Sequence, residues 1–381
     1  MAYKKLPDLR FSGFSDEWKE IKFSEIYTKS YGGGTPSKKN QDFWNDGTIP
    51  WFQSSDLVEG KLTKENVNKK ISEKAIVKSS VKVIPGGSIA IVTRVGVGKL
   101  ALIDFDYSTS QDFLSISGFK TKTMYALYLI YNLMNVLKNS LQGTSIKGIT
   151  KPELNSKRIR ISTDSLEQQK IGEFFIKQDK LIELQTQKVD QLKKLKRGYL
   201  QKMFPQEGET VPRLRFSGFS GEWKEEKLGD KLCVKMGQSP HSENYTDDNK
   251  NSILVQGNAD ILNGKIKPRV YTKEITRTSK KDEIIMTVRA PVGELAFNQF
   301  DNVVIGRGVA SLSGNKFDYY SLVNIKDKGL WKRFSSGSTF DSINSSDIKL
   351  MTIKVPKEDE QQKIGTFFSK LDKLIKQQSR K

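Results

Sequence analysis

The segment LRFSGFSDEWKE occupies residues 9–20, and LRFSGFSGEWKE occupies residues 214–225. Eleven of the twelve positions agree, and the one difference is Asp16 against Gly221. The two copies begin 205 residues apart. Repetition at this distance is typical of a duplicated structural unit, because each unit needs its own copy of the segments that build it.

A second repeat follows in the same order. EQQKIGEFFIKQDKLIELQTQK occupies residues 167–188 and EQQKIGTFFSKLDKLIKQQSRK occupies residues 360–381, with 15 of 22 positions identical at an offset of 193. The offset therefore falls from 205 to 193 while the order is kept. This pattern predicts two tandem domains, each followed by a helix, with interiors that have diverged.

Weaker similarities lie between these repeats. IPWFQSSDLVEGKL from Ile49 matches ILVQGNADILNGKI from Ile253, and GTSIKGI from residue 143 matches GSTFDSI from residue 337. IAIVTRVGVGKLA matches IIMTVRAPVGELA and aligns Arg94 with Arg289. Short β-rich stretches alternate here with turn signals such as YGGGTP and LNGK, and residues 124–141 have helical spacing. We therefore expect α+β domains with a curved sheet.

The EQQKIG segments are predicted to be long helices. Ser165 and Gln168 have the spacing of a capping box, and no proline follows until Pro205. Such a helix would be about 55 Å long if straight. A heptad stripe predicts that the two helices pair as an antiparallel coiled coil, which would relate the domains by a pseudo-two-fold axis. The expected pairing residues are Phe175, Ile182, Val189, Leu192, Tyr199, Phe368, Leu371 and Ile375. The alternative is that each helix packs on its own domain.

Composition points to a polyanionic partner. Lys and Arg number 64 against 44 Asp and Glu, which leaves a net charge of +20. A surplus of this size favours nucleic acid first and anionic membrane second, and a basic but inert surface is the alternative. No apolar run reaches the roughly 18–20 residues that cross a bilayer. The single cysteine, Cys233, fits a reducing cytoplasm. The segment MAYKKLPDLRFSG has no apolar h-region and no small-residue cleavage site, so we do not expect secretion.

The sequence shows no catalytic motif. GVGKL at residues 96–100 is not a phosphate-binding loop, because Thr93 stands where glycine is required and Leu100 where serine or threonine is required. His241 is the only histidine, which argues against histidine-based triads and two-histidine metal sites. No carboxylate group recurs in both copies. We expect no catalytic residue and no metal or cofactor bound by this chain.

Side chains suited to DNA do recur. Arg94 and Arg289 each lie in a glycine-bearing turn after a β-like stretch, and an arginine fork can read guanine in the major groove. Amide and hydroxyl side chains in probable loops can contact adenine and phosphate. The candidate DNA-binding residues are Arg94, Lys99, Ser54, Ser55, Thr144, Ser145, Lys147, Arg289, Gln256, Asn258, Arg307, Ser338 and Thr339.

These motifs together resemble a known family. LRFSGFS-x-EW begins each half, a glycine-rich loop follows as YGGGTPSKKNQDFW or KMGQSPHSENY, and EQQKIG opens a helix that ends KLKRGYLQKMFP. This pattern resembles the specificity subunit of a Type I restriction-modification system over nearly the whole chain. The resemblance implies a first target recognition domain at residues 1–164 and a central conserved helix at 165–205. It implies a second recognition domain at 206–356 and a C-terminal conserved helix at 357–381.

The resemblance also implies a role and partners. Each recognition domain would read one half of a bipartite site in double-stranded DNA. Two methyltransferase subunits would bind this chain to form an adenine-N6 methyltransferase that uses S-adenosylmethionine. Two restriction subunits would then complete the ATP-driven nuclease, so that S-adenosylmethionine, ATP and Mg²⁺ are expected in partner chains. The expected location is the bacterial cytoplasm, with no membrane.

The second helix departs from the pattern. The first copy continues past Lys188 with VDQLKKLKRGYLQKMFP, whereas the second stops at Lys381, the equivalent position. Either the gene or the expressed chain is shortened there, or a partner chain completes the helix pair.

Two other kinds of function are weighed against this reading. A stand-alone enzyme that modifies or cleaves DNA would need an acid or cofactor site, which the sequence does not show. A coiled-coil scaffold without DNA binding would need another explanation for the charge of +20.

Overall fold

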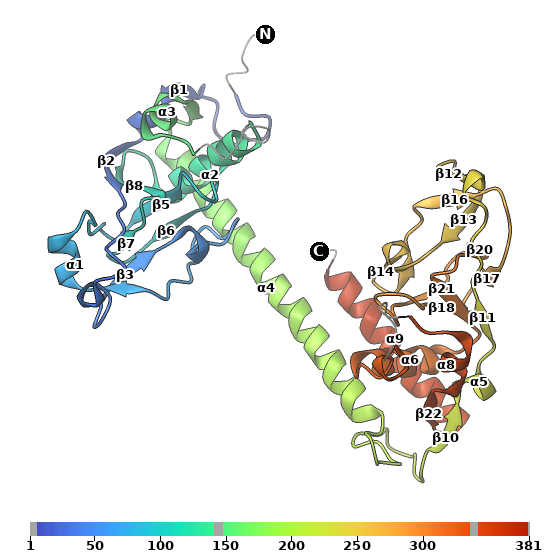
Figure 1. The fold of residues 1–381 in the computed structure, drawn as a ribbon. Coiled ribbons are helices and arrows are strands. Elements are labelled where there is room, and N and C mark those ends of the chain that lie inside the picture. The colour runs from blue at the N-terminus through green and yellow to red at the C-terminus, as the bar shows by residue number, and fades with distance from the viewer. Residues whose placement is uncertain (1–5, 141–147, 336–341, 380–381) are drawn as a thin grey trace. The chain divides into compact units, whose positions relative to one another are not determined.

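A computed structural model describes residues 6–140, 148–335 and 342–379 of the chain (Figure 1). The chain divides into two compact units, Met1–Ile182 and Glu183–Lys381, called unit 1 and unit 2 below. The division falls inside one long helix, so that the first half of this helix belongs to unit 1 and the second half to unit 2. Both units combine helices and strands, as the sequence predicts.

Unit 1 is built on an antiparallel four-stranded sheet with strand order β2-β8-β5-β6. A three-stranded arrangement β4-β3-β7 lies beside it, and β1 pairs with β9 at the start and end of the domain. The strands are β1 (Lys19–Lys22), β2 (Tyr27–Gly32), β3 (Ile49–Phe52), β4 (Lys70–Ile71), β5 (Ser88–Val92), β6 (Leu100–Ile103), β7 (Ser108–Thr109), β8 (Phe113–Phe119) and β9 (Arg158–Ile161).

Both faces of the four-stranded sheet are buried. Ile89 and Ile91 of β5 pack on one side against helix α2 (Thr123–Ser140), which confirms the predicted helix. Ala90 and Val92 point to the other side and pack against Phe52 of β3. Strand residues alternate between faces, so β5 is apolar from Ile89 to Val92 because both of its faces are covered. The remaining helices of this unit are α1 (Glu73–Lys78), α3 (Lys151–Ser156) and the first half of α4 (Ser165–Met203).

Unit 2 repeats this plan with larger sheets. A six-stranded sheet has the order β11-β21-β18-β19-β15-β14, a five-stranded sheet has the order β12-β16-β13-β20-β17, and β10 pairs with β22. The strands are β10 (Lys224–Lys227), β11 (Val234–Met236), β12 (Tyr245–Thr246), β13 (Ser252–Val255), β14 (Ile261–Leu262), β15 (Lys265–Ile266), β16 (Val270–Thr272), β17 (Thr278–Lys280), β18 (Ile284–Thr287), β19 (Leu295–Phe297), β20 (Asn302–Ile305), β21 (Val309–Leu312) and β22 (Thr352–Val355).

Helices cover one face of the six-stranded sheet. Ile284 and Met286 of β18 share a core with Phe317 of α6 and Phe368 of α9. Ile285 faces the opposite side and packs against Val255 and other residues of the five-stranded sheet. The helices of this unit are α5 (Leu228–Lys231), α6 (Lys316–Asp327), α7 (Lys332–Ser335), α8 (Ser345–Leu350), α9 (Glu358–Gln378) and the second half of α4.

The second half of α4 pairs with α9, as the heptad pattern predicts. Lys196 contacts Asp372 at 2.6 Å, and the rings of Tyr199 and Phe367 lie 5.2 Å apart. Gln185 contacts Gln378 at 2.8 Å. Partners on α9 have lower numbers as those on α4 rise, so the helices run antiparallel.

The start of α4 differs from the sequence prediction. Oδ1 of Asp164 accepts hydrogen bonds from the backbone N–H groups of Leu166 and Glu167 at 2.7 and 3.1 Å, so Asp164 is the N-cap and Ser165 lies inside the helix. The side chain of Gln168 is not part of a capping box, because it donates to the carbonyl of Ser162. Aspartate and serine cap helices about equally well, and here the tertiary fold selects the aspartate.

The two repeated motifs contact each other in both units. Arg10 of the first LRFSGF motif forms a two-pronged ion pair with the buried Glu167 of EQQKIG, at 2.6 and 2.9 Å. Arg215 does the same with Glu360, at 2.7 Å for both bonds. Burial alone would raise the pKa of Glu167, but hydrogen bonds, led by those from Arg10, lower it below its ordinary value. The ion pair therefore fastens the entry of each domain to the start of its helix.

Other residues of the repeated motifs also hold the domain entry and the helix together. The amino group of Lys170 lies 4.9 Å from the ring centroid of Phe14, and that of Lys363 lies 5.2 Å from the ring centroid of Phe219. At Gly172 an added Cβ would lie 2.9 Å from the backbone nitrogen of Tyr125, and Gly365 is equally close to Phe317 in unit 2. The glycine lets the conserved helix approach the domain helix closely. The repeats therefore build one joint twice.

In the described residues, no helix is both long enough and apolar enough to span a bilayer.

Candidate nucleic-acid interface

Each unit contains one parallel strand pair, and in both units the same backbone hydrogen bond joins the residues at the end of the pair. In unit 1, β3 pairs in parallel with β7, and the N–H of Ser110 donates to the carbonyl of Phe52 at 2.8 Å. In unit 2, β13 pairs in parallel with β20, and the N–H of Gly306 donates to the carbonyl of Val255 at 2.8 Å. The residues that follow these strands are therefore held side by side in the same way in both units.

Within the strands, this equivalence shifts the sequence alignment by one residue. The similarity of IPWFQ to ILVQG placed Ile49 opposite Ile253, whereas the shared hydrogen bonds place Phe52 opposite Val255. The 3-10 turns that follow keep the predicted register, with Gln53 and Gly257 as their N-caps. Few side chains are common to these strands, so their backbone pairing defines the register better than their letters do.

In each unit a glycine-rich loop packs against the turn that follows the parallel strand pair. A Cβ added at Gly33 would lie 1.9 Å from the carbonyl oxygen of Ser110, and one added at Gly237 would lie 2.1 Å from the carbonyl oxygen of Gly306. No other residue fits such an approach without moving backbone. The segments YGGGTP and KMGQSP thus occupy equivalent positions. In both, the backbone packs closely against the turn that follows the second strand of the pair.

The turns that carry Arg94 and Arg289 are hydrogen-bonded to the segments that follow the parallel strand pairs. The N–H of Thr93 donates to the carbonyl of Asp112 at 2.8 Å, and the N–H of Val288 donates to the carbonyl of Gly308 at 2.9 Å. Arg94 and Arg289 follow directly, and both are exposed. The two arginines therefore occupy equivalent, outward positions beside equivalent turns, as the alignment predicts.

A carboxylate holds the third loop in each unit. Oδ2 of Asp56 accepts from the N–H of Gln53 at 2.7 Å, and Oδ2 of Asp260 accepts from the N–H of Gln256 at 2.8 Å. Each closes one turn of 3-10 helix, at Ser54–Asp56 and Asn258–Asp260. We call the recognition frame of each unit the turn that follows the second strand of the parallel pair, together with the three segments that hold it: the glycine-rich loop, the arginine turn and the 3-10 turn.

The predicted DNA-contacting residues are placed unequally. Arg94, Ser55, Arg289, Asn258 and Arg307 are exposed, and Ser54 is half-buried. Nζ of Lys99 donates to the carbonyl of Ser54 at 3.1 Å and ties two loops together. The amide of Gln256 donates to the hydroxyl of Tyr245 at 2.8 Å. The predicted residues Thr144, Ser145, Lys147, Ser338 and Thr339 lie outside the described residues.

The structure adds a residue that the sequence comparison missed. Counting outward from Ser110 and Gly306 places Gln111 opposite Arg307, which had no partner in the sequence alignment. The segments around them, YSTSQDFLSI and VVIGRGVASL, share almost no letters. Only the backbone frame could reveal this pair.

The residues predicted to pair the two helices differ in how deeply they are buried. Val189, Phe368 and Leu371 are buried, and Leu192, Tyr199 and Ile375 are half-buried. Phe175 and Ile182 lie in the half of α4 that belongs to unit 1, where their exposed fractions are 43% and 60%. The ring of Phe175 contacts Tyr128 of its own domain at 5.1 Å.

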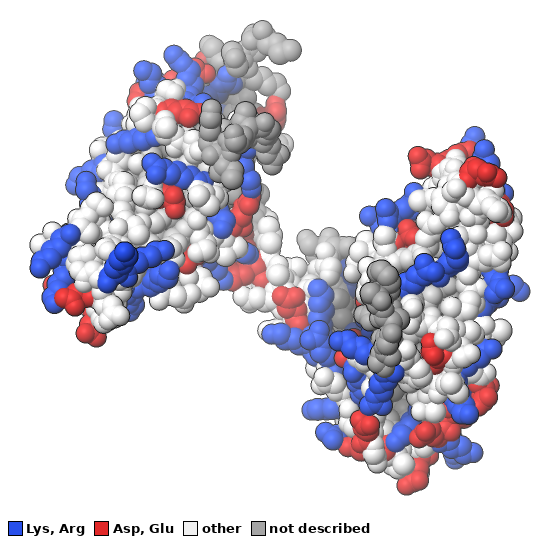
Figure 2. Space-filling model, in the orientation of Figure 1, with Lys and Arg blue, Asp and Glu red and all other residues white. Residues whose placement is uncertain are grey.

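Charge is spread over both units. Figure 2 shows Lys and Arg side chains scattered across the visible face of each unit, with fewer acidic side chains between them. Lys69 lies against the frame of unit 1, because its amino group donates to Oε1 of Gln53 at 2.7 Å. The positive charge therefore reaches the recognition frame but is not confined to it.

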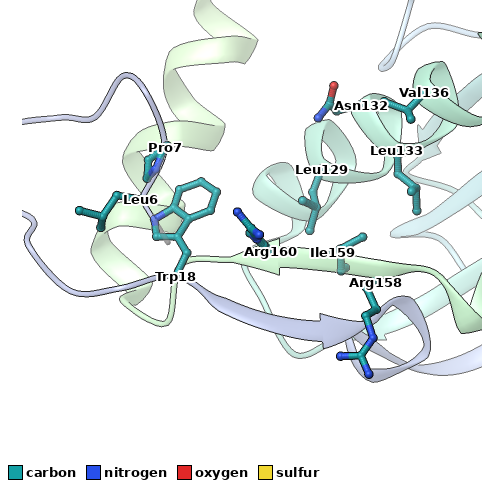
Figure 3. A pocket seen from close by; sticks show the side chains of 10 residues that line it. All are labelled: Leu6, Pro7, Trp18, Leu129, Asn132, Leu133, Val136, Arg158, Ile159 and Arg160. Atoms are coloured by element: carbon teal, nitrogen blue, oxygen red, sulfur yellow. The ribbon is translucent and has the colours of Figure 1, made fainter. Parts of the chain in front are cut away.

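A groove of about 390 Å³ lies elsewhere on unit 1 (Figure 3). Its walls come from the N-terminal segment, α2 and β9, and they are mainly apolar. The lining residues are Leu6, Pro7, Trp18, Leu129, Asn132, Leu133, Val136, Arg158, Ile159 and Arg160.

The corresponding region of unit 2 is filled by the end of α4. The ring of Phe204 lies 5.6 Å from that of Phe317 and 6.0 Å from that of Trp223, whose unit 1 equivalents are Tyr125 and Trp18. Lys328, the equivalent of Val136, donates to the carbonyl of Pro205 at 3.4 Å. Burial beneath this segment lowers the pKa of Lys328, partly offset by Glu209. The groove is thus the space for a segment like Phe204–Pro205.

Within residues 6–140, 148–335 and 342–379, no three His, Cys, Asp or Glu side chains cluster as metal ligands would.

Comparison with known proteins agrees with this geometry. The family model of the Type I restriction modification DNA specificity domain matches twice, at residues 15–194 and 220–381. The chain belongs to this family. It carries two such domains in tandem, each with its conserved helix.

Individual relatives carry the same name. A putative Type I restriction enzyme MjaX specificity subunit from Methanocaldococcus jannaschii is 28% identical over 271 residues, covering 67% of this chain and 63% of the relative. The EcoR124I/EcoR124II specificity subunit from Escherichia coli is 33% identical over 182 residues, covering 45% of this chain and 43% of the relative. The chain thus spans less than two thirds of the length of these two relatives.

Solved structures share the fold. The Type I restriction-modification S subunit from M. genitalium aligns with a TM-score of 0.63 at 16% identity, covering 98% of this chain and 94% of that chain. At this identity the likeness establishes the fold of two domains with long helices.

Proposed function

We propose that this chain is the non-catalytic DNA-specificity subunit of a Type I restriction-modification enzyme, and that it reads a bipartite target through its two recognition frames. The main support is one observation. Both units hold the same backbone frame with the same glycine contact, yet the matched, exposed positions on it carry Gln111 in one unit and Arg307 in the other. A catalytic site would keep its side chains in both copies, whereas two readers of different bases need some different side chains on a shared frame.

The repeated joint suggests how partners bind. Arg10–Glu167 and Arg215–Glu360 are identical pairs in the two units, and so are the lysine–phenylalanine contacts beside them. Equivalent surfaces suit two copies of one partner. We infer that two methyltransferase subunits dock there and that two restriction subunits join through them. S-adenosylmethionine, ATP and Mg²⁺ would bind those partner chains, in the bacterial cytoplasm.

Purified chain tests this proposal directly. With S-adenosylmethionine, ATP and Mg²⁺ supplied, the chain alone should neither methylate nor cut DNA. It should bind double-stranded DNA with an affinity that falls steeply as salt rises, since phosphate contacts release counterions. Turnover by pure chain would favour a stand-alone enzyme, and absence of DNA binding at low salt would favour a scaffold.

A further inference from the structure

The recognition frames differ most at one matched pair of positions. Gln111 and Arg307 each follow the first residue of the turn that the glycine loop presses upon. On either side the backbone is tied down in both units. Ser110 and Gly306 are bonded to the neighbouring strand, while Asp112 and Gly308 accept from the arginine turn. The backbone at both positions is therefore held at three points.

The two side chains themselves are exposed. Within the described parts of the chain, neither side chain makes a hydrogen bond or an ion pair. The neighbouring glutamines, in contrast, already have side-chain partners: Gln53 accepts a hydrogen bond from Lys69, and Gln256 donates one to Tyr245. A long polar side chain on a rigid, doubly bonded turn is ready to bind a ligand without rearranging the backbone.

We propose that Gln111 and Arg307 are specificity-determining residues that read one base pair each, in the half-sites of unit 1 and unit 2 respectively. This inference rests on the proposed function. Glutamine pairs in two-pronged fashion with N6 and N7 of adenine, and arginine with O6 and N7 of guanine. The same frame thus presents an adenine reader in one unit and a guanine reader in the other.

The competing role for Arg307 is a phosphate contact. A phosphate contact carries no sequence information, whereas a guanine contact does. Arg307→Gln separates these roles, because loss of a phosphate contact lowers methylation of every site alike, whereas loss of a guanine contact changes which base is accepted at one position.

The test uses the full chain with its methyltransferase partner, followed by sequencing of methylated adenines across a genome. Arg307→Gln should reduce methylation of the original motif by about tenfold or more and change or relax one guanine in one half-site. Gln111→Arg should act on one adenine in the other half-site. Thermal melting of each variant checks that the fold is intact.

A matched control comes from the far end of the same strand region. Lys281, beside the start of β20, is 58% exposed and pairs with the exposed Asp301. Lys281→Gln removes one positive charge away from the frame and should leave the motif unchanged.

Each outcome decides. If the wild-type chain gives a bipartite motif that the variants keep, with methylation unchanged or evenly reduced, the two residues do not read bases and this inference is wrong while the proposed function stands. If substitutions of Gln111 and of Arg307 alter the same half-site, the claim that these two residues read different half-sites is wrong. If the wild-type chain directs methylation to no bipartite motif, the proposed function itself fails.

Discussion

Gln185 of α4 and Gln378 of α9 contact each other through their side chains at 2.8 Å, and they are equivalent positions of the repeat, 193 residues apart. Contact between equivalent residues is what a local two-fold axis between two antiparallel helices produces. Beyond this point each helix should pack against the same kind of partner. The structure describes this packing for the second half of α4, where Leu200 and Met203 are buried.

The first prediction compares two equivalent phenylalanines. Phe368 of α9 is fully buried in the core that α9 shares with α4 and α6, whereas Phe175 of α4 is 43% exposed. Phe368→Ala should lower the free energy of unfolding by about 3–5 kcal/mol, because it leaves a cavity in the core. Phe175→Ala should cost clearly less. Urea unfolding followed by tryptophan fluorescence measures both, and equal losses would show that the two helix halves are packed alike.

A second prediction concerns the ion pair at the joint. The pKa of Glu167 is lowered in the fold, so its carboxylate contributes stability that is complete above its unfolded pKa of about 4.5 and is lost as the pH falls through the lower folded value. Glu167→Gln should be less stable than wild type at pH 7. The difference should shrink below about pH 4.5.

Unfolding measured from pH 7 to pH 3 checks this. Glu153→Gln is a suitable control, since Glu153 is half exposed and its carboxylate pairs with Lys157 one helical turn away. A wild-type and Glu167→Gln difference that stays constant with pH would mean that shape, not charge, makes the contact stabilising.

Features whose amino acids are repeated in both halves could be predicted from the sequence. Features that the two halves share only in backbone conformation could not. The two helices, their antiparallel pairing, α2 and the matched Arg94 and Arg289 all follow from periodicity and repetition. The N-cap could not be chosen from sequence, because Asp164 and Ser165 are adjacent and equally suited. Gln111 was missed because its link to Arg307 depends on distant glycine contacts, and such contacts leave no local pattern.

The third prediction concerns Arg94 and Arg289. Each is exposed beside its recognition frame. Replacing either by Ala should weaken or relax recognition of its own half-site by about 1–3 kcal/mol if the arginine reads a base in two-pronged fashion. Methylation sequencing should show the effect in one half-site for Arg94→Ala and in the other for Arg289→Ala. Unchanged methylation of both half-sites would assign these arginines a structural role.

The fourth prediction uses a fragment that ends near Pro205. It would expose Leu200, Met203 and Phe204, which unit 2 normally buries. It would also keep the open groove of unit 1 and the exposed Ile182. Two fragments should therefore form an isologous dimer, in which the α4 end of each copy fills the groove of the other.

The target of such a dimer should be palindromic. It should contain the first half-site, a spacer and the inverted first half-site, with centres about one helical turn, ~10 bp, apart. Light scattering and methylation sequencing with the partner subunit would test this. Phe204→Ala should weaken the dimer, and shortening α4 within its heptads should weaken it or alter the spacer. A monomeric fragment, or one that directs methylation to a single half-site, would contradict the antiparallel helix model.

The most direct test of the account is the methylated motif of the intact chain. Co-expression with its methyltransferase partner, followed by genome-wide sequencing of methylated adenines, reads this motif in one experiment. Two tandem recognition frames predict one bipartite sequence, made of two different half-sites separated by a fixed number of unspecified bases. A single contiguous motif, or no motif, would contradict the claim that each unit reads its own half of a DNA target.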